Sequence, residues 1–120
     1  MAARILHVSD PHIGRGEDLS ALYAVRDLGA ARVLAVEVDV TQEAACKAMV
    51  ARTLDSFGRI DVLINVAGFD HDSGLPLEKI TLERLHKNVD TNLTTCFLCC
   101  QAAAKIMKEQ KGGAIVNMSS

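Results

Sequence analysis

The sequence predicts an α/β fold, a three-layer sandwich around a short and mostly parallel sheet of about four strands. Apolar runs rich in β-branched residues alternate along the chain with stretches whose apolar side chains recur at helical spacing. This alternation is typical of parallel strands joined by helical crossovers. With 120 residues, of which 49% are apolar, the chain is long enough to bury one core. We therefore expect a single domain over residues 1–120.

In the first half of the chain, residues 4–8 are predicted to form a strand, followed by a loop that extends to about Gly16. Residues 19–28 carry a weak helical stripe that Gly29 would end. The β-branched run at residues 32–38 is predicted to be a buried parallel strand. Thr41 is the expected N-cap of a helix over residues 42–57, which should stop at Gly58.

In the second half, residues 60–66 are predicted to form a buried strand, which should lie beside the strand at residues 4–8. A loop rich in Asp, Gly and Ser follows at residues 69–76. Helical spacing then predicts two helices, at residues 81–87 and 89–110, and the second should stop at Gly112. Residues 114–118 are the last predicted strand.

Composition excludes several classes of partner. The chain has 13 basic and 15 acidic side chains and a net charge of -2, so no cationic surface for nucleic acid is expected. None of its apolar runs approaches the roughly 20 residues that cross a bilayer. Its four cysteines show no disulfide spacing and are interpreted as buried free thiols. A cytoplasmic protein without nucleic-acid or membrane partners is predicted.

Residues suited to a ligand follow three of the predicted strands. A parallel sheet binds ligands at the carboxyl ends of its strands. Asp39 and Val40 follow one strand, Asn65-Val66-Ala67-Gly68 ends the next, and Asn117-Met118-Ser119-Ser120 ends the last. They offer a carboxylate or backbone edge for an adenine, small residues for close approach of a ribose, and a hydroxyl group.

Together with Thr91-Asn92-Leu93, these segments resemble the short-chain dehydrogenase/reductase family in order and spacing over residues 30–120. The resemblance implies a Rossmann-like fold that binds NAD or NADP. It places Asp39 and Val40 beside the adenine. It also implies that three residues line the cofactor ribose, namely Asn65, Ala67 and Gly68.

The same resemblance implies two residues of the catalytic machinery. Asn92 would hold a helix kink and a water of the proton relay, and Ser120 would orient the substrate carbonyl. The family's catalytic Tyr and Lys, four residues apart, would come a dozen or so positions after Ser120. Tyr23, the one tyrosine in the sequence, has no Lys four residues on. Because that pair moves the proton, we expect a truncated domain with weak or residual nucleotide binding and without full oxidoreductase activity.

A second departure from the family lies at residues 1–16. The family's glycine-rich turn binds the pyrophosphate with backbone amides. Gly14 and Gly16 keep the spacing of that turn and are the candidate cofactor-binding glycines, but Asp10 stands where the first glycine would be. A carboxylate beside a diphosphate lowers affinity. A β-α unit of the family also has no counterpart before residue 32.

Residues 4–14 instead resemble the opening strand of calcineurin-like metallophosphoesterases, whose Asp-x-His motif matches Asp10 and His12. If these residues approach Asp70 and His71, their carboxylates and imidazoles would suit Zn or Mn, and a metal-bound water could attack a phosphoester. A small metal-dependent phosphoesterase is therefore the second hypothesis. The simpler alternative is that residues 69–73 form a solvated acidic loop.

The two resemblances together suggest a chimera, with residues 1–16 joined to a dehydrogenase-like core at residues 30–120. A third hypothesis is thus a chimeric or engineered folding unit without catalytic activity. Residues 89–110 are apolar on more than one helix face, and the last strand would have an open edge. We therefore expect a homodimer or higher oligomer through this helix and this strand.

Overall fold

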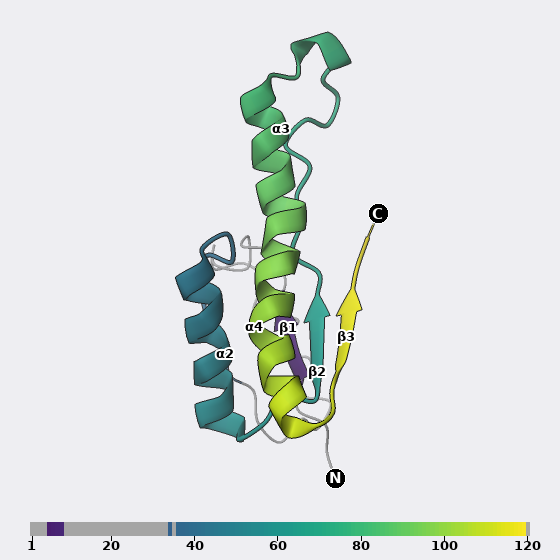
Figure 1. Cartoon of the computed structure of the whole chain (residues 1–120). Helices are drawn as coiled ribbons and strands as arrows, with labels where there is room; N and C mark the ends of the chain where they lie inside the picture. The colour runs from purple at the N-terminus through teal and green to yellow at the C-terminus, as the bar shows by residue number, and fades with distance from the viewer. Residues whose placement is uncertain (1–4, 9–33, 35, 120) are drawn as a thin grey trace, which may run out of the picture.

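The computed structural model describes residues 5–8, 34 and 36–119 of the chain. Three short parallel strands, β1 (Ile5–Val8), β2 (Val62–Asn65) and β3 (Ala114–Asn117), form a sheet in the order β1-β2-β3 (Figure 1). Asn65 of β2 pairs with Val8 on one side and with Asn117 on the other. The predicted α/β fold with a short parallel sheet is confirmed, including the placement of the first strand beside residues 60–66.

The predicted strand at residues 32–38 is not found in the described part of that segment. Residues 36–39 have no regular secondary structure, so the described sheet has three strands and not four. A strand needs a neighbour that takes up its backbone hydrogen bonds. No described strand pairs with residues 36–39. The helix expected at residues 19–28 lies outside the described residues.

Helix α2 (Glu43–Phe57) forms close to its predicted bounds. It ends at Gly58, whose φ of 80° places it in the left-handed region that favours glycine, and the Gly58 amide donates to the Leu54 carbonyl. Its N-cap is Gln42 and not Thr41. The Thr41 amide and hydroxyl both donate to Oδ1 of Asp39, at 3.0 and 2.6 Å.

The two helices predicted at residues 81–87 and 89–110 form one continuous helical run. A 3-10 turn (Leu77–Lys79) precedes α3 (Leu82–Val89), a π-helix (Asp90–Thr94) follows, and α4 (Thr95–Gln110) completes the run. The predicted break is thus a π-helical segment, in which the helix widens without ending. The predicted glycine stop is wrong in its position: the C-cap of α4 is Lys111, which takes the left-handed conformation with a φ of 61°. The amide of Gly112 then donates to the Met107 carbonyl.

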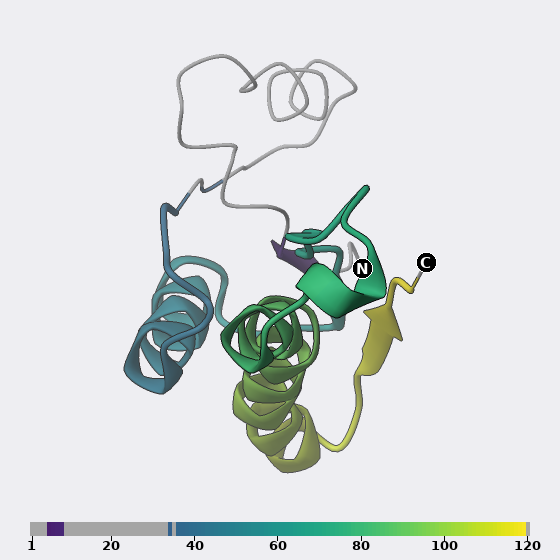
Figure 2. The same cartoon turned by 90° about the horizontal axis from the view of Figure 1, so that it is seen from above.

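The core lies between the sheet and the two long helices. Helix α4 packs on β2 and β3, α2 packs on α4, and Figure 2 shows both helices on the same side of the sheet. The buried apolar residues are Val40, Cys46, Met49, Val50, Ile60, Leu63, Cys99, Ala103 and Met107. In the part of the chain that the structure describes, we find no helix with the length and apolarity needed to span a membrane.

Candidate functional site

The predicted ligand-binding residues that the structure describes lie toward the carboxyl end of the sheet. Figure 1 shows the carboxyl ends of β2 and β3 at the same end as the start of α2 and the π-helix. This end therefore carries Asp39, the segment from Asn65 to Gly68, and Asn92. The remaining candidates, Gly14, Gly16 and Ser120, lie outside the described residues.

Asn65 is a buried polar residue at the end of β2, with 5% of its surface exposed. Its Nδ2 donates to Oδ1 of Asn117 at 2.9 Å and also lies 3.3 Å from Sγ of Cys100. Its Oδ1 is buried and has no hydrogen-bond partner among the described residues. Buried acceptors are normally satisfied, so this oxygen can accept from a water or from a bound molecule.

Gly68 lies close to the side chain of Asn92. Asn92 lies in the π-helix, where Oδ1 accepts from the Phe69 amide at 3.0 Å and Nδ2 donates to the Phe69 carbonyl at 2.8 Å. A Cβ atom at position 68 would lie 2.7 Å from Oδ1 of Asn92. The side chain of Asn92 therefore leaves no room for a Cβ atom at position 68, and this favours glycine there. The resemblance implied a helix kink at Asn92, and the structure has a π-helix there, whose Asn92 side chain bonds Phe69 after the turn. The role of Asn92 in a proton relay stays a prediction.

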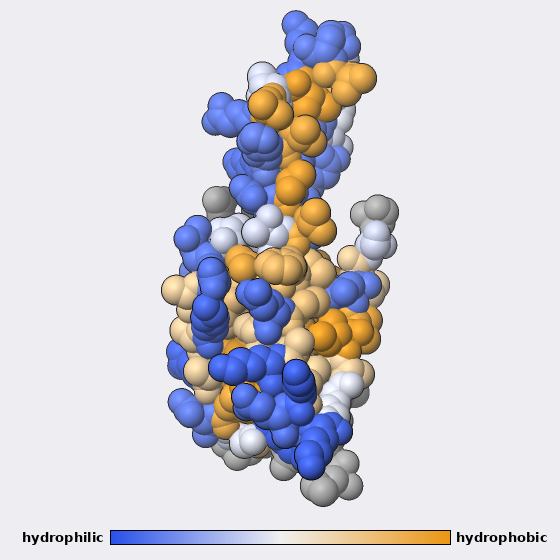
Figure 3. Space-filling model, in the orientation of Figure 1, coloured by the Kyte–Doolittle hydropathy of each residue, from blue (hydrophilic) through white to orange (hydrophobic). Residues whose placement is uncertain are grey.

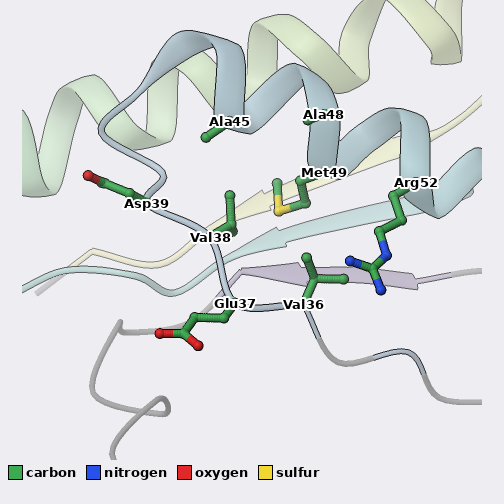
Figure 4. A pocket seen from close by; sticks show the side chains of 8 residues that line it. All are labelled: Val36, Glu37, Val38, Asp39, Ala45, Ala48, Met49 and Arg52. Carbon is green, nitrogen blue, oxygen red and sulfur yellow. The ribbon is translucent and has the colours of Figure 1, made fainter.

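Asp39 lies beside a shallow hollow of about 360 Å³ between α2 and residues 36–39 (Figure 4). Asp39 is exposed, and its Oδ1 accepts from Thr41. Val40 is 6% exposed and belongs to the core, so a ligand at this point would meet its backbone and not its side chain. The hollow is lined by Val36, Glu37, Val38, Asp39, Ala45, Ala48, Met49 and Arg52.

The loop after Gly68 was interpreted as a source of metal ligands, and the described residues give that hypothesis no support. Nε2 of His71 lies 2.9 Å from Oγ1 of Thr91, and Oδ1 of Asp70 accepts from the Asp72 amide at 2.9 Å. Within residues 5–8, 34 and 36–119, no three His, Cys, Asp or Glu side chains are arranged to hold a metal ion. Asp10 and His12 lie outside the described residues.

Sequence reasoning missed the partners of Asp72 in this loop. The Asp72 side chain is 8% exposed, and its carboxylate accepts from Nε of Arg84 at 2.5 Å and from Nδ2 of Asn88. The only available signal was the spacing of Arg84 and Asn88, four residues apart and hence on one helix face. That spacing does not reveal which loop residue the face meets.

All four cysteines were predicted to be buried thiols, but Cys96 and Cys100 are only half-buried. Cys46 and Cys99 are each 1% exposed, and their Sγ atoms lie 3.9 Å apart between α2 and α4. Burial raises the pKa of Cys99 to about 12 and also raises the pKa of Cys46. A thiol with a raised pKa is a poor nucleophile at neutral pH. These two side chains are therefore core packing groups.

Polar side chains at the carboxyl ends of parallel strands define an α/β domain of the ligand-binding type. A family model described as short chain dehydrogenase matches residues 13–120, and the chain belongs to that family.

Two curated relatives illustrate the similarity. A 3-oxoacyl-[acyl-carrier-protein] reductase from Synechocystis sp. is 40% identical over 87 residues, which cover 72% of this chain and 34% of the relative. A 3beta-hydroxysteroid dehydrogenase from Mediterraneibacter gnavus is 33% identical over 109 residues, covering 90% and 39% of the two chains. The chain thus spans about a third of the length of these relatives.

Solved structures show the same similarity. The crystal structure of gox2181 matches with a TM-score of 0.78 and 28% identity, covering 100% of this chain and 55% of the other. ElxO with NADP bound matches with a TM-score of 0.74 and 25% identity, covering 99% and 56%. These matches confirm the predicted Rossmann-like fold class.

Proposed function

We propose that this chain is an NAD(P)-binding domain of a short-chain oxidoreductase. The observation that carries the proposal is the turn from Asn65 to Gly68, which the side chain of Asn92 holds at the carboxyl end of the central strand β2. This is the edge at which an open α/β sheet binds its ligand. The structural similarity to ElxO with NADP bound supports the same cofactor class here.

The described residues fit a dinucleotide at two points. Asp39 is exposed beside the hollow on α2, where a carboxylate can accept from the amino group of an adenine. Ala67 and Gly68 have small side chains or none, which leaves room for a ligand close to the backbone. The buried Oδ1 of Asn65 has no hydrogen-bond donor among the described residues. A bound nicotinamide would supply or accept the hydride, and the protein residues would hold and orient the cofactor. Gly14 and Gly16 would serve the pyrophosphate, against the opposing charge of Asp10.

The reaction class that we assign is the interconversion of an alcohol and a carbonyl group, because the relatives are named as reductases and dehydrogenases. These 120 residues contain one tyrosine, Tyr23, and no Tyr-x-x-x-Lys motif. We propose that this chain by itself binds the nucleotide weakly and does not turn over substrate. Calorimetric titration with NAD, NADP, AMP and ADP tests the binding. Gly68→Val, which forces a side chain against Asn92, should abolish the binding of the two dinucleotides.

We also propose that the chain associates with itself through the helical run and β3. An apolar stripe follows one face of the run (Figure 3), and three of its members, Val89, Leu93 and Phe97, are 40%, 64% and 58% exposed. All four residues of β3 are exposed as well. A partner copy would remove both surfaces from water.

The four cysteines of the chain are all free. Free thiols suit a reducing compartment, and we therefore assign the protein to the cytoplasm.

A further inference from the structure

Three polar side chains on one face of the helical run hold the loop that follows Gly68. Asn92 bonds the amide and the carbonyl of Phe69. Asn88 accepts from the His71 amide at 3.0 Å, and Arg84 donates to the His71 carbonyl. We call Arg84, Asn88 and Asn92, with the loop groups that they bond, the helix–loop ladder.

The spacing of the ladder follows from elementary geometry. Residues four apart in a helix rise by about 6.0 Å, and residues two apart in an extended chain advance by about 6.6 Å. Alternate loop residues can therefore each meet a side chain on a successive helical turn. Phe69 meets Asn92 in this way, and His71 meets Asn88.

The ladder is anchored at its far end by Asp72. This carboxylate is 8% exposed and bonds both Arg84 and Asn88, whereas Arg84 is 42% exposed. A carboxylate so far removed from water is costly to leave without its partner. The Asp72–Arg84 pair should therefore contribute to holding the loop on the helix.

The ladder ends at the turn that the proposed function assigns to the cofactor. Asn92 is at once the last side chain of the ladder and the group against which Gly68 lies. The turn follows β2, whose neighbour β3 carries Asn117. Under the proposed function Ser120, which comes after β3 in the sequence, would orient the substrate carbonyl, so we assign the turn to the nicotinamide half. Asp39, by contrast, precedes α2 and lines the hollow beside that helix (Figure 4).

We propose that Asp72 and Arg84 are positioning residues for the nicotinamide half of the dinucleotide, acting through Asn88 and Asn92 on the Gly68 turn. The inference rests on the proposed function. Because the adenine half would be held at Asp39, loss of the pair should weaken the binding of NAD or NADP and leave the binding of AMP unchanged. A general loss of stability would weaken the binding of the dinucleotides and of AMP together.

The experiment compares Arg84→Met with Arg84→Lys, which restores the charge, and with Lys87→Met, an exposed control on the same helix. Asp72→Asn serves as a milder second variant. Dissociation constants for NADP and AMP are measured by calorimetry, and amide exchange at Phe69 and His71 is followed by NMR. We expect Arg84→Met and Asp72→Asn to weaken the affinity for NADP by about threefold to tenfold and to change the affinity for AMP by no more than about twofold. Both variants should speed exchange at the two amides. Arg84→Lys should recover part of the affinity.

An unchanged NADP affinity in Arg84→Met, or parallel losses of NADP and AMP, would overturn the inference. If the unaltered protein binds neither nucleotide, the proposed function fails, and the positioning role fails with it. Amide exchange then still decides whether the ladder holds the loop. If the amides of Phe69 and His71 exchange in Arg84→Met at the same rate as in the Lys87→Met control, the role of the ladder in holding the loop is overturned too.

Discussion

Nδ2 of Asn65 donates a 2.9 Å hydrogen bond to Oδ1 of Asn117, and this bond joins the carboxyl ends of β2 and β3. The two residues face one another in the parallel register. The amide of Met118 also donates to the Asn65 carbonyl, at 2.9 Å. The turn after β2 and the end of β3 are thus fixed relative to each other, and this fixes the site between them.

Replacing Asn117 by Ala should destabilise the fold. The change removes the oxygen acceptor from a side-chain amide that is 5% exposed, and an unsatisfied buried donor costs about 1–3 kcal/mol. Urea unfolding measures the loss. Met118→Ala, at a side chain that is 63% exposed, is the matched control, and equal unfolding free energies for the two variants would refute this role for Asn117.

The contact between Gly68 and Asn92 predicts non-additive mutations. Gly68→Ala alone should cost about 1–3 kcal/mol, because its Cβ would come within 2.7 Å of Oδ1 of Asn92. In an Asn92→Ala background that oxygen is gone, so the same change should cost much less. A double-mutant cycle in urea gives the coupling energy. Additive losses would show that Gly68 is not required by Asn92.

Features set by neighbouring residues were predictable from the sequence. Gly58 ends α2 as expected, because the left-handed conformation at a helix end is a local preference of glycine. The pairing of β1 with β2 followed from the topology of parallel sheets. Asn65, Gly68 and Asn92 were recognised by order and spacing, and the structure places them at one end of the fold.

Features that depend on distant partners were not predictable. The family resemblance implied an irregular helix at Asn92, but not the partner of its side chain, because Phe69 is 23 residues away and helical periodicity does not reveal that contact. Arg84 meets Asp72 across 12 residues for the same reason. The run at residues 36–38 has strand composition but lacks a neighbouring strand in the described sheet, and composition does not show whether a neighbour is present.

Stability should fall at alkaline pH because of Cys99. Burial raises the pKa of its thiol from 9.0 to about 12 in the folded protein. Between these values the unfolded chain loses the proton while the folded chain keeps it, so the unfolded state is favoured as pH rises from about 9 to about 12. Urea unfolding from pH 8 to 11 should show a shallower decline in Cys99→Ala. Identical slopes for the two proteins would contradict the assignment.

Self-association should depend on Phe97, which is 58% exposed on the apolar stripe. Sedimentation at tens of micromolar should give the unaltered chain at least twice its mass of 12.9 kDa. Phe97→Gln should shift it toward the monomer, because a polar group in the interface would lose water without gaining a partner. Lys105→Gln, an exposed position on α4, should stay associated. A monomeric unaltered chain would refute the proposed interface.

Nucleotide binding by the unaltered protein is the most direct test of the proposed function. Calorimetric titration with NAD, NADP, AMP and ADP at concentrations up to millimolar should give saturable heat, with weak affinity because Asp10 stands at the diphosphate turn. Asp39→Ala should weaken all four ligands, since each of them contains adenine, whereas Gly68→Val should remove the binding of the two dinucleotides. The absence of saturable heat with all four nucleotides would contradict the assignment of this chain as a nucleotide-binding domain.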